Sequence, residues 1–592
     1  MDAKSAQVTI PGGGFVVGPT PPEAAFTPED MTDDHRMVQR TVEQYLEQEV
    51  HPHVKEIDEH NWDLVVKLFR GFGELGFLGA DIPEAYGGSG LDKISALVIK
   101  DAMSSAASFA VMVSAHTGIG TLPIVFFGNE EQKQKYLPKL ASGEWVTSYA
   151  LTEPTAGSDA MAIRARATLS PDGSHYVITG VKQFITNAKM ADLYLTYAKV
   201  DGEHHSCFIV ERGTEGVTIG EEEHKLGIKG TSTASIFLEN ARVPAANLLG
   251  EIGQGHKIAF NILNVGRFYL AAGCVGGSRF ALREAVVYAN ERKQFGKSIS
   301  EFGLIQQKLA RMAAAIFAAE SMLYRTGGLI SEALGGEAHD SGQVVAALEE
   351  YAIECSVNKI FCSEALDAVV DEALQIHGGY GYVEEYPVAR AYRDSRINRI
   401  FEGTNEINRL LIPAMLLRRA QKGRLGLFAA AQKVAGEMLS PTVGGDGAVS
   451  GPLAEERRLV DAARRAVLFA AGAATQKYLT DLENQQEILG GIADMAIDLF
   501  AIESAVLRAA KTAARGGASA GLQAAMAAYF LDDALPRIET NARRVLAATE
   551  DGDTLRTMLS GLRRFLKIPS VNTVSLGRQI AGAVIKAGRY VS

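Results

Sequence analysis

The feature that most constrains this chain is a change of pattern from helical to β-rich and back to helical. Residues 146 to 250 hold short β-rich runs such as HYVITGVKQFITN and TASIFLENARVP, separated by turn signals such as Pro171-Asp172-Gly173. From His256 to Gln421 the segments are instead long, Ala-rich and helical. We therefore predict a mainly α protein with a central β domain, in which four long helices pack side by side after the strands.

Two glycine-rich segments mark the remaining boundaries. The first, with PGGG and PTPPE, predicts a tail that is mobile or laid over the surface, and the second, PTVGGDGAVSGP, precedes a further helical region. The expected parts are a flexible N-terminal tail (1–27), an N-terminal helical domain (28–147), a middle, barrel-like β domain (148–256), a four-helix bundle domain (257–422) and a C-terminal helical extension (423–592).

Composition excludes some classes of protein. A net charge of -11 argues against a general nucleic-acid binder, because neutralising phosphates needs a basic face. The four cysteines show no metal-ligand spacing, so we expect reduced core thiols and no metal site. No signal or transit peptide is visible, and we expect a cytoplasmic protein. The cysteines are Cys207, Cys274, Cys355 and Cys362.

Three segments resemble the sequence patterns of other kinds of function. The uncharged stretch 102–129 could suggest a membrane span, but His116 and Pro123 favour a buried helix followed by a turn. Residues 71–76 match GxGxxG but follow a helical run, so a helix end is predicted. A basic amphipathic helix begins near Arg457, and it either packs on the protein or contacts a membrane surface or partner. Its expected apolar face is Leu459, Ala463, Ala466, Ala470 and Ala473.

The stretch from Gln375 to Arg409 is the strongest candidate for one wall of a functional site. It combines a double glycine, several arginines and one carboxylate framed by small residues, Phe401-Glu402-Gly403-Thr404. We interpret Glu402 as a candidate catalytic base, the alternative being a surface glutamate near a helix start.

An ordered set of motifs resembles the acyl-CoA dehydrogenase family over residues 35 to 420. The motifs are LTEPTAGSD, GVKQFITNA, LGIKGTSTA, ILNVGRF, ERKQFGKSISEF, QIHGGYGY and FEGTNEINR. The helical extension, with NQQEILGGIADMAIDLFAIESAVLRA, is similar to that of the very-long-chain subgroup. The resemblance implies an FAD-dependent enzyme of fatty-acid β-oxidation that converts acyl-CoA to trans-2-enoyl-CoA.

In this resemblance Glu402 matches the base that removes the α proton, while flavin N5 accepts hydride from the β carbon. An α C–H beside a thioester is a weak acid, so the base must be desolvated and the enolate oxygen needs donors. Some relatives place the base immediately before Arg267, where this chain has Gly266, which cannot act. Arg267 resembles a buried arginine that supports the wall.

The resemblance also assigns binding residues. For FAD these are Tyr149, Leu151, Thr152, Gly157, Ser158, Phe184 and Thr186 of the β domain, Arg292, Gln294 and Phe295 with Gln375 and Gly379 from a neighbouring subunit, and Thr404 and Glu406 beyond the base. For the substrate they are Ser158, Arg267, Phe401, Glu402 and Gly403, with Ala110, Val111, Ser114 and Gly118 as possible acyl-pocket lining.

Partners and alternatives follow from the same resemblance. The acceptor of electrons would be an electron-transferring flavoprotein, long acyl chains would be preferred, and the chain would form a homo-oligomer, with a dimer favoured. An acyl-CoA oxidase that uses dioxygen, or a dehydrogenase-like assembly or scaffolding protein, remains an alternative. Peripheral membrane contact through the extension is left open.

Overall fold

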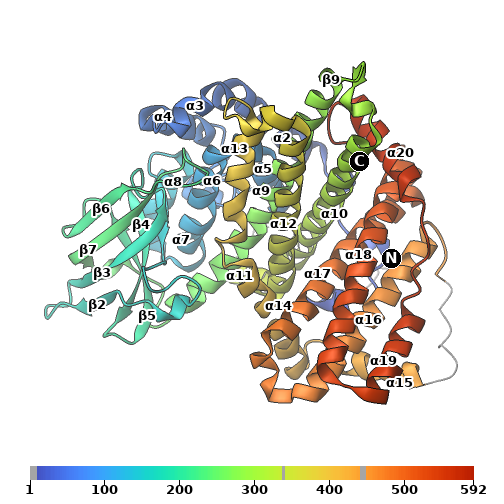
Figure 1. Ribbon diagram of the computed structural model, residues 1–592. Helices are drawn as coiled ribbons and strands as arrows, with labels where there is room; N and C mark the ends of the chain where they lie inside the picture. The colour runs from blue at the N-terminus through green and yellow to red at the C-terminus, as the bar shows by residue number, and fades with distance from the viewer. Residues whose placement is uncertain (1–9, 336–340, 440–448) are drawn as a thin grey trace, which may run out of the picture.

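The structure, a computed structural model, describes residues 10–335, 341–439 and 449–592. Figure 1 shows a β sheet on one side, N-terminal helices above it, a bundle of long helices in the centre and further helices on the opposite side. This arrangement confirms the predicted fold class, a mainly helical protein with a central β domain and an extra C-terminal helical part.

The N-terminal helices begin with sequence signals of ordinary kinds. Thr32 caps α2 by accepting a hydrogen bond from the His35 backbone N–H, as its position before two aspartates predicts. Gly71 and Gly73 lie inside the last turns of α4, and Gly76 follows at a φ of 81°, so the GxGxxG segment is a helix end as predicted. The main helices are α2 (Asp33–Tyr45), α3 (Val54–Asp58), α4 (Trp62–Glu74), α5 (Lys93–Ala102), α6 (Ser108–Ser114), α7 (Leu122–Phe127) and α8 (Glu130–Ser142).

The uncharged segment is a buried helical run. Helix α6 continues through one wide turn, η7 (Ala115–Gly120), into α7, and 72% of the most apolar window is buried inside the protein. Helix α9 (Gly255–Glu291) is also long and apolar enough to cross a membrane by composition, and its window is buried to the same 72%. Both runs pack as core helices of the folded chain.

The middle domain is one twisted sheet in the order β6-β7-β3-β2-β4-β5-β8, with β1 paired parallel to β4. Strands β3 and β7 pair antiparallel, and their register shifts between Lys182 and Ile185. This bulge contains Phe184, whose φ is 58°, a conformation that non-glycine residues rarely adopt. The strands are β1 (Thr147–Ala150), β2 (Arg166–Leu169), β3 (His175–Thr186), β4 (Leu193–Val200), β5 (His204–Glu211), β6 (Val217–Glu222), β7 (Thr233–Pro244) and β8 (Leu248–Leu249).

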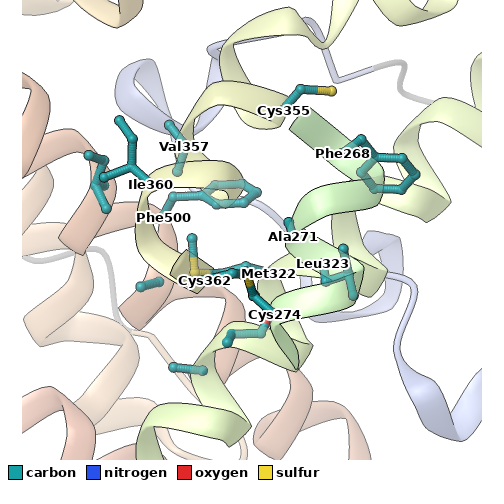
Figure 2. Close-up of a cluster of buried hydrophobic side chains, with 14 of the residues drawn as sticks. Phe268, Ala271, Cys274, Met322, Leu323, Cys355, Val357, Ile360, Cys362 and Phe500 are labelled. Atoms are coloured by element: carbon teal, nitrogen blue, oxygen red, sulfur yellow. The ribbon is translucent and has the colours of Figure 1, made fainter. Parts of the chain in front are cut away.

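The bundle consists of α9 with α10 (Gly303–Leu334), α12 (Ala352–His377) and α14 (Asn405–Gln421), the four long helices that the pattern predicts. Two shorter helices accompany them, α11 (Ser341–Glu350) and α13 (Pro387–Ser395). Cys274, Cys355 and Cys362 lie in the bundle core with Met322 and Phe500 (Figure 2). All four cysteines are free and buried, which confirms the expected core thiols.

The extension packs its helices against the bundle. The face predicted for α16 (Ala454–Tyr478) is largely buried against α17 (Gln486–Ala514) and α18 (Ala520–Thr549). Arg464 is buried as well, because it forms an ion pair with Glu503 of α17 at 2.5 Å. Packing on the protein is thus the arrangement that the described residues adopt. The other helices are α15 (Leu427–Leu439), α19 (Gly552–Phe565) and α20 (Thr573–Ala587).

The expectation of a flexible tail over 1–27 is wrong for its described part, 10–27. This segment forms a short helix, α1 (Gly14–Val17), that lies between the bundle and the extension. The Phe15 ring is 4.8 Å from that of Phe500, and the Gly13 N–H donates to Glu354 Oε1 at 2.7 Å. Burial of this apolar turn outweighs the flexibility that its glycines predict. Residues 1–9 lie outside the described chain.

Candidate active site

Glu402 sits in a short loop between the turn η12 (Arg396–Arg399) and the start of α14. Its φ is 59° and that of Gly403 is 79°, so two successive residues have left-handed backbone. Such a conformation is costly for a glutamate and persists only where surrounding contacts enforce it. Thr404 ends the loop by accepting a hydrogen bond from the Ile407 backbone N–H, which caps α14.

The glycine at position 266 makes room for the Glu402 carboxylate. A Cβ atom at Gly266 would lie 2.4 Å from Glu402 Oε2 and 2.6 Å from its carboxyl carbon. The carboxylate therefore rests directly on the backbone of α9. A side chain on this residue would displace the candidate base from its position.

Three side chains hold the loop through its carbonyl oxygens. Arg267 Nε donates to the Glu402 carbonyl at 3.2 Å, and Lys359 Nζ donates to the Gly403 carbonyl at 2.8 Å. Asn408 Nδ2 donates to the carbonyls of Gly403 and Thr404 at 2.9 and 3.1 Å. These contacts come from α9, α12 and α14, so the strained loop is fixed from three helices at once.

Burial dominates the electrostatics of the carboxylate. Oε2 of Glu402 is buried and has no hydrogen-bond partner among the described residues. Desolvation raises the pKa of Glu402 to about 7, against the opposing effect of the nearby cations Arg267 and Lys359. A carboxylate with this pKa can accept a proton effectively near neutral pH.

One apolar cavity opens beside Glu402 and follows α9. Along α9 its wall is Gly266, Tyr269, Leu270, Gly273, Gly277 and Phe280, a single helical stripe. The residues predicted for the acyl pocket, Ala110, Val111, Ser114 and Gly118, all line the same cavity. Phe401 and Thr186 reach the same cavity, whose volume is about 170 Å³.

The loop that follows β1 is anchored by a buried ion pair. Lys182 Nζ lies 2.6 Å from Glu153 Oε1 and also donates to the Leu151 carbonyl at 3.2 Å. Glu153 in turn accepts the backbone N–H of Ala165 at 3.0 Å. Lys182 is completely buried, and desolvation lowers its pKa to about 8. These bonds fix the loop at Leu151 and Glu153, and Gly157 and Ser158 further along it are exposed to solvent.

The exposed groups beside this loop fit a flat aromatic cofactor with a phosphate tail. Phe184 is 58% exposed although it is a large aromatic residue, and a Cβ atom on Gly157 would meet no neighbouring atom within 4 Å. An exposed aromatic face suits ring stacking, and a bare backbone lets N–H groups approach phosphate oxygens. Gly157 and Ser158 are exposed, whereas the Tyr149 ring packs on Tyr197 at 5.1 Å.

The residues predicted for the nucleotide end lie elsewhere in the chain. The hairpin of β9 (Lys293–Gln294) and β10 (Lys297–Ser298) follows Arg292, whose guanidinium lies 5.6 Å from the Tyr380 ring next to Gly379. Gln375 is sixteen residues beyond Lys359 on α12, about 24 Å along the helix. Figure 1 shows this hairpin at the opposite end of the bundle from α14. Within one chain these residues are therefore separated from Glu402. Phe295 on the hairpin is 93% exposed.

Lys359, Asn408 and Lys182 were not predicted from the sequence. A lysine inside the apolar run of α12 was a usable signal, because a buried lysine needs a polar partner. Asn408 lies four residues after Thr404 and looks like an ordinary helix residue. Lys182 and Glu153 both fall inside quoted motifs, but only the folded sheet brings them together.

The fold and site define the class as a flavin-dependent dehydrogenase, and comparisons with known proteins agree. The acyl-CoA dehydrogenase N-terminal domain matches residues 32–144 and the middle domain residues 148–241. Two models of an acyl-CoA dehydrogenase C-terminal domain match residues 253–417 and 462–564.

Whole-length relatives give the same result. A probable acyl-CoA dehydrogenase of Bacillus subtilis (strain 168) is 49% identical over 595 residues, covering 99% of this chain and 100% of the relative. The mitochondrial very long-chain specific acyl-CoA dehydrogenase of Bos taurus is 36% identical over 517 residues, covering 83% and 77%. A crystal structure of an acyl-CoA dehydrogenase complexed with FAD from Bacillus anthracis superposes with a TM-score of 0.96 at 48% identity, covering 98% and 100%.

The chain therefore belongs to the acyl-CoA dehydrogenase family, and it is an FAD-dependent oxidoreductase. The extra C-terminal domain and the very long-chain relatives confirm the expected subgroup similarity.

Proposed function

We propose that the protein dehydrogenates long-chain acyl-CoA between the α and β carbons, with Glu402 as the base that takes the α proton. The observation that carries this proposal is the buried, unpartnered Oε2 of Glu402 at the wall of an apolar cavity, among the residues that the structure describes. The α C–H beside the thioester is a weak acid, so the base that removes its proton must be desolvated and held against the substrate. Removal of this proton leaves an enolate. Bound FAD supplies the hydride acceptor for the β carbon.

The residues of this chain have separate tasks. Glu402 accepts the proton on its carboxylate, and Gly266 leaves the space that this carboxylate occupies against α9. The apolar walls exclude water, which preserves the basicity of the carboxylate. Tyr149, Leu151, Thr152, Gly157, Ser158, Phe184 and Thr186, with Thr404 and Glu406, hold the flavin, and Ser158, Phe401, Gly403 and Arg267 complete the substrate wall.

Long-chain preference is supported by the length of the cavity. From Gly266 to Phe280 the lining stripe spans fourteen residues of α9, about 21 Å along the helix. Small residues at 273 and 277 leave this path open. A short acyl chain would leave most of the cavity uncovered, so each further methylene adds apolar burial worth about 0.8 kcal/mol.

An anaerobic titration of the flavoprotein with palmitoyl-CoA and, separately, butyryl-CoA tests the proposal. We expect palmitoyl-CoA to bleach the flavin band at lower concentration, and Glu402→Gln to abolish bleaching while it still binds FAD. Bleaching that survives in Glu402→Gln would refute the base assignment. Equal response to both substrates would refute the chain-length assignment alone.

An electron-transferring flavoprotein is the proposed acceptor. The alternative is an acyl-CoA oxidase, in which dioxygen takes the electrons directly. Reoxidation of substrate-reduced enzyme in air separates the two: slow reoxidation without peroxide supports the dehydrogenase, and rapid peroxide formation supports the oxidase. A scaffolding role has no separate observation in its favour in the described parts of the chain.

The active enzyme is proposed to be a homodimer that shares its flavin sites. Arg292, Gln294, Phe295, Gln375 and Gly379 would reach the nucleotide end of the FAD bound by the partner. The separation of these residues from Glu402 within one chain supports this arrangement, as does the exposure of Phe295. Large exposed aromatic residues commonly mark protein interfaces.

Complementation tests the shared site. Glu402→Gln and Arg292→Ala chains, each inactive as homodimers, are co-expressed with different tags and the mixed dimer is isolated. One of its two sites then combines an intact Glu402 with an intact Arg292, so we expect about half of the parent activity. A mixed dimer that stays inactive would contradict sharing, whatever the outcome of the titration.

A further inference from the structure

Lys359 is a completely buried lysine that the proposed reaction does not use. It lies on α12 with 0% of its surface exposed. Its ammonium donates to the Gly403 carbonyl at 2.8 Å and to Asn405 Oδ1 at 2.6 Å, and both acceptors are neutral. Asn405 is held in turn by Ser363 and Glu364, so this contact is rigid.

A buried ammonium with neutral partners is costly. Ionic groups in protein interiors are normally paired, because desolvation costs several kcal/mol for each ion. The hydrogen bonds of Lys359 and Arg267 go to neutral oxygens, and no ion pair among the described residues includes either cation; Arg267 is only 6% exposed. Two buried cations therefore lie behind one buried carboxylate, Glu402.

The groups that face this cluster come from every helix around it. Burial lowers the pKa of both cations, that of Lys359 to about 8, and Glu402 is the acid that opposes this effect on each of them. The remaining titratable groups are Cys274 on α9, Cys355 and Glu364 on α12, and Tyr149 on β1. Glu364 is already bound in a bidentate pair by Arg409, at 2.8 and 2.9 Å, so Glu402 is the acid without a partner of its own among these described groups.

We propose that Lys359 is a positioning residue that keeps Glu402 in its ionised, left-handed conformation, acting through the Gly403 carbonyl and through its charge. This inference rests on the proposed role of Glu402 as the base. Without this support the desolvated carboxylate would take up a proton more readily and lose its ability to accept one from substrate. Arg267 provides the second charge, from α9.

The two ways in which Lys359 acts can be separated. The hydrogen bond holds the backbone at Gly403, and its loss would lower the rate at every pH. The charge favours the carboxylate form, and its loss would raise the pKa of Glu402 and displace the pH profile. A lysine that only fills space in α12 would produce neither effect when replaced by methionine, which has similar length and no charge.

The test is the pH dependence of flavin bleaching by palmitoyl-CoA, measured anaerobically by stopped flow between pH 6 and pH 9. For Lys359→Met we expect the acidic limb of the plot of bleaching rate against pH to move to higher pH by about one unit, the size of shift that a close charge produces. We also expect a slower maximal bleaching rate. Lys359→Arg, which keeps the charge, should leave the limb within a few tenths of a unit of the parent. An unmoved limb in a folded, FAD-loaded Lys359→Met enzyme would overturn the inference.

Two controls make the outcome specific. Lys511→Met removes another buried lysine, one that pairs with Asp30 far from Glu402, and should leave the pH profile unchanged. If Lys359→Met does not fold, Lys359→Gln keeps a donor for the Gly403 carbonyl without the charge, and its limb must still move upward. Bleaching by Glu402→Gln enzyme would instead reject the base itself, so failure of the two proposals gives different results.

Discussion

Replacing Glu402 with glutamine is expected to remove activity and, at alkaline pH, to stabilise the protein. The pKa of Glu402 is raised from 4.5 to about 7 by burial. A carboxyl whose pKa is higher in the folded state contributes its full stability below its unfolded pKa, and that contribution is lost as pH rises through the folded value. Glutamine stays neutral throughout, so Glu402→Gln avoids the loss.

The magnitude follows from the pKa difference. A rise from 4.5 to about 7 corresponds to about 3.4 kcal/mol in the fully ionised state, at about 1.36 kcal/mol per unit. The unfolding entropy of a 592-residue chain is about 1.2 kcal/mol/K, at about 2.1 cal/mol/K per residue. If the chain unfolds as one unit, the expected rise in Tm at pH 8.5 is therefore about 3 °C, with a rise of only about 0.7 °C at pH 5, where about 0.8 kcal/mol of the difference is expressed.

Differential scanning calorimetry of the FAD-loaded parent and the Glu402→Gln variant at both pH values measures this effect. Glu131→Gln, an exposed position on α8, is the matched control and should shift neither value. A Tm rise of the same size at pH 5 and pH 8.5 would show that the effect is one of packing. A lower Tm for Glu402→Gln than for the parent at pH 8.5 would refute the argument that the ionised, buried Glu402 carboxylate destabilises the folded protein.

Three further outcomes are expected. Gly266→Ala retains FAD but loses substrate bleaching, because its Cβ would lie 2.4 Å from Glu402 Oε2; undiminished bleaching would contradict the geometry. Gly273→Leu keeps butyryl-CoA turnover and loses palmitoyl-CoA turnover, because it fills the cavity about 10 Å along α9 from Gly266; steady-state rates for both substrates decide. Lys182→Met leaves Glu153 buried without its ion-pair partner, a loss of about 3–5 kcal/mol. We expect this variant to have a lower FAD occupancy, measured by the ratio of flavin absorbance to protein absorbance.

Much of the fold follows from local pattern. The change from 2-residue to 3.6-residue periodicity predicts the β domain and the long helices, and Thr32 marks a helix start correctly. The tail is the instructive failure. Its glycines and prolines favour flexibility, but Phe15 and Val16 are buried between the bundle and the extension, a site that two distant segments create.

The candidate site divides in the same way. Glu402 could be singled out from its motif, and Gly266 from the absence of a side chain that could act. Neither pattern indicates that the two touch, or that the loop has positive φ values. Lys359 and Asn408 were missed because their importance depends on which carbonyl oxygens they reach.

The sequence by itself determined the order of domains, the family and the candidate base, because periodicity, turn residues and motif order are properties of neighbouring residues. Only the tertiary structure decided the buried state of Glu402, the two buried cations behind it and the course of the N-terminal segment. Desolvation and charge compensation arise between residues far apart in the chain, so they are set when α9, α12 and α14 pack together.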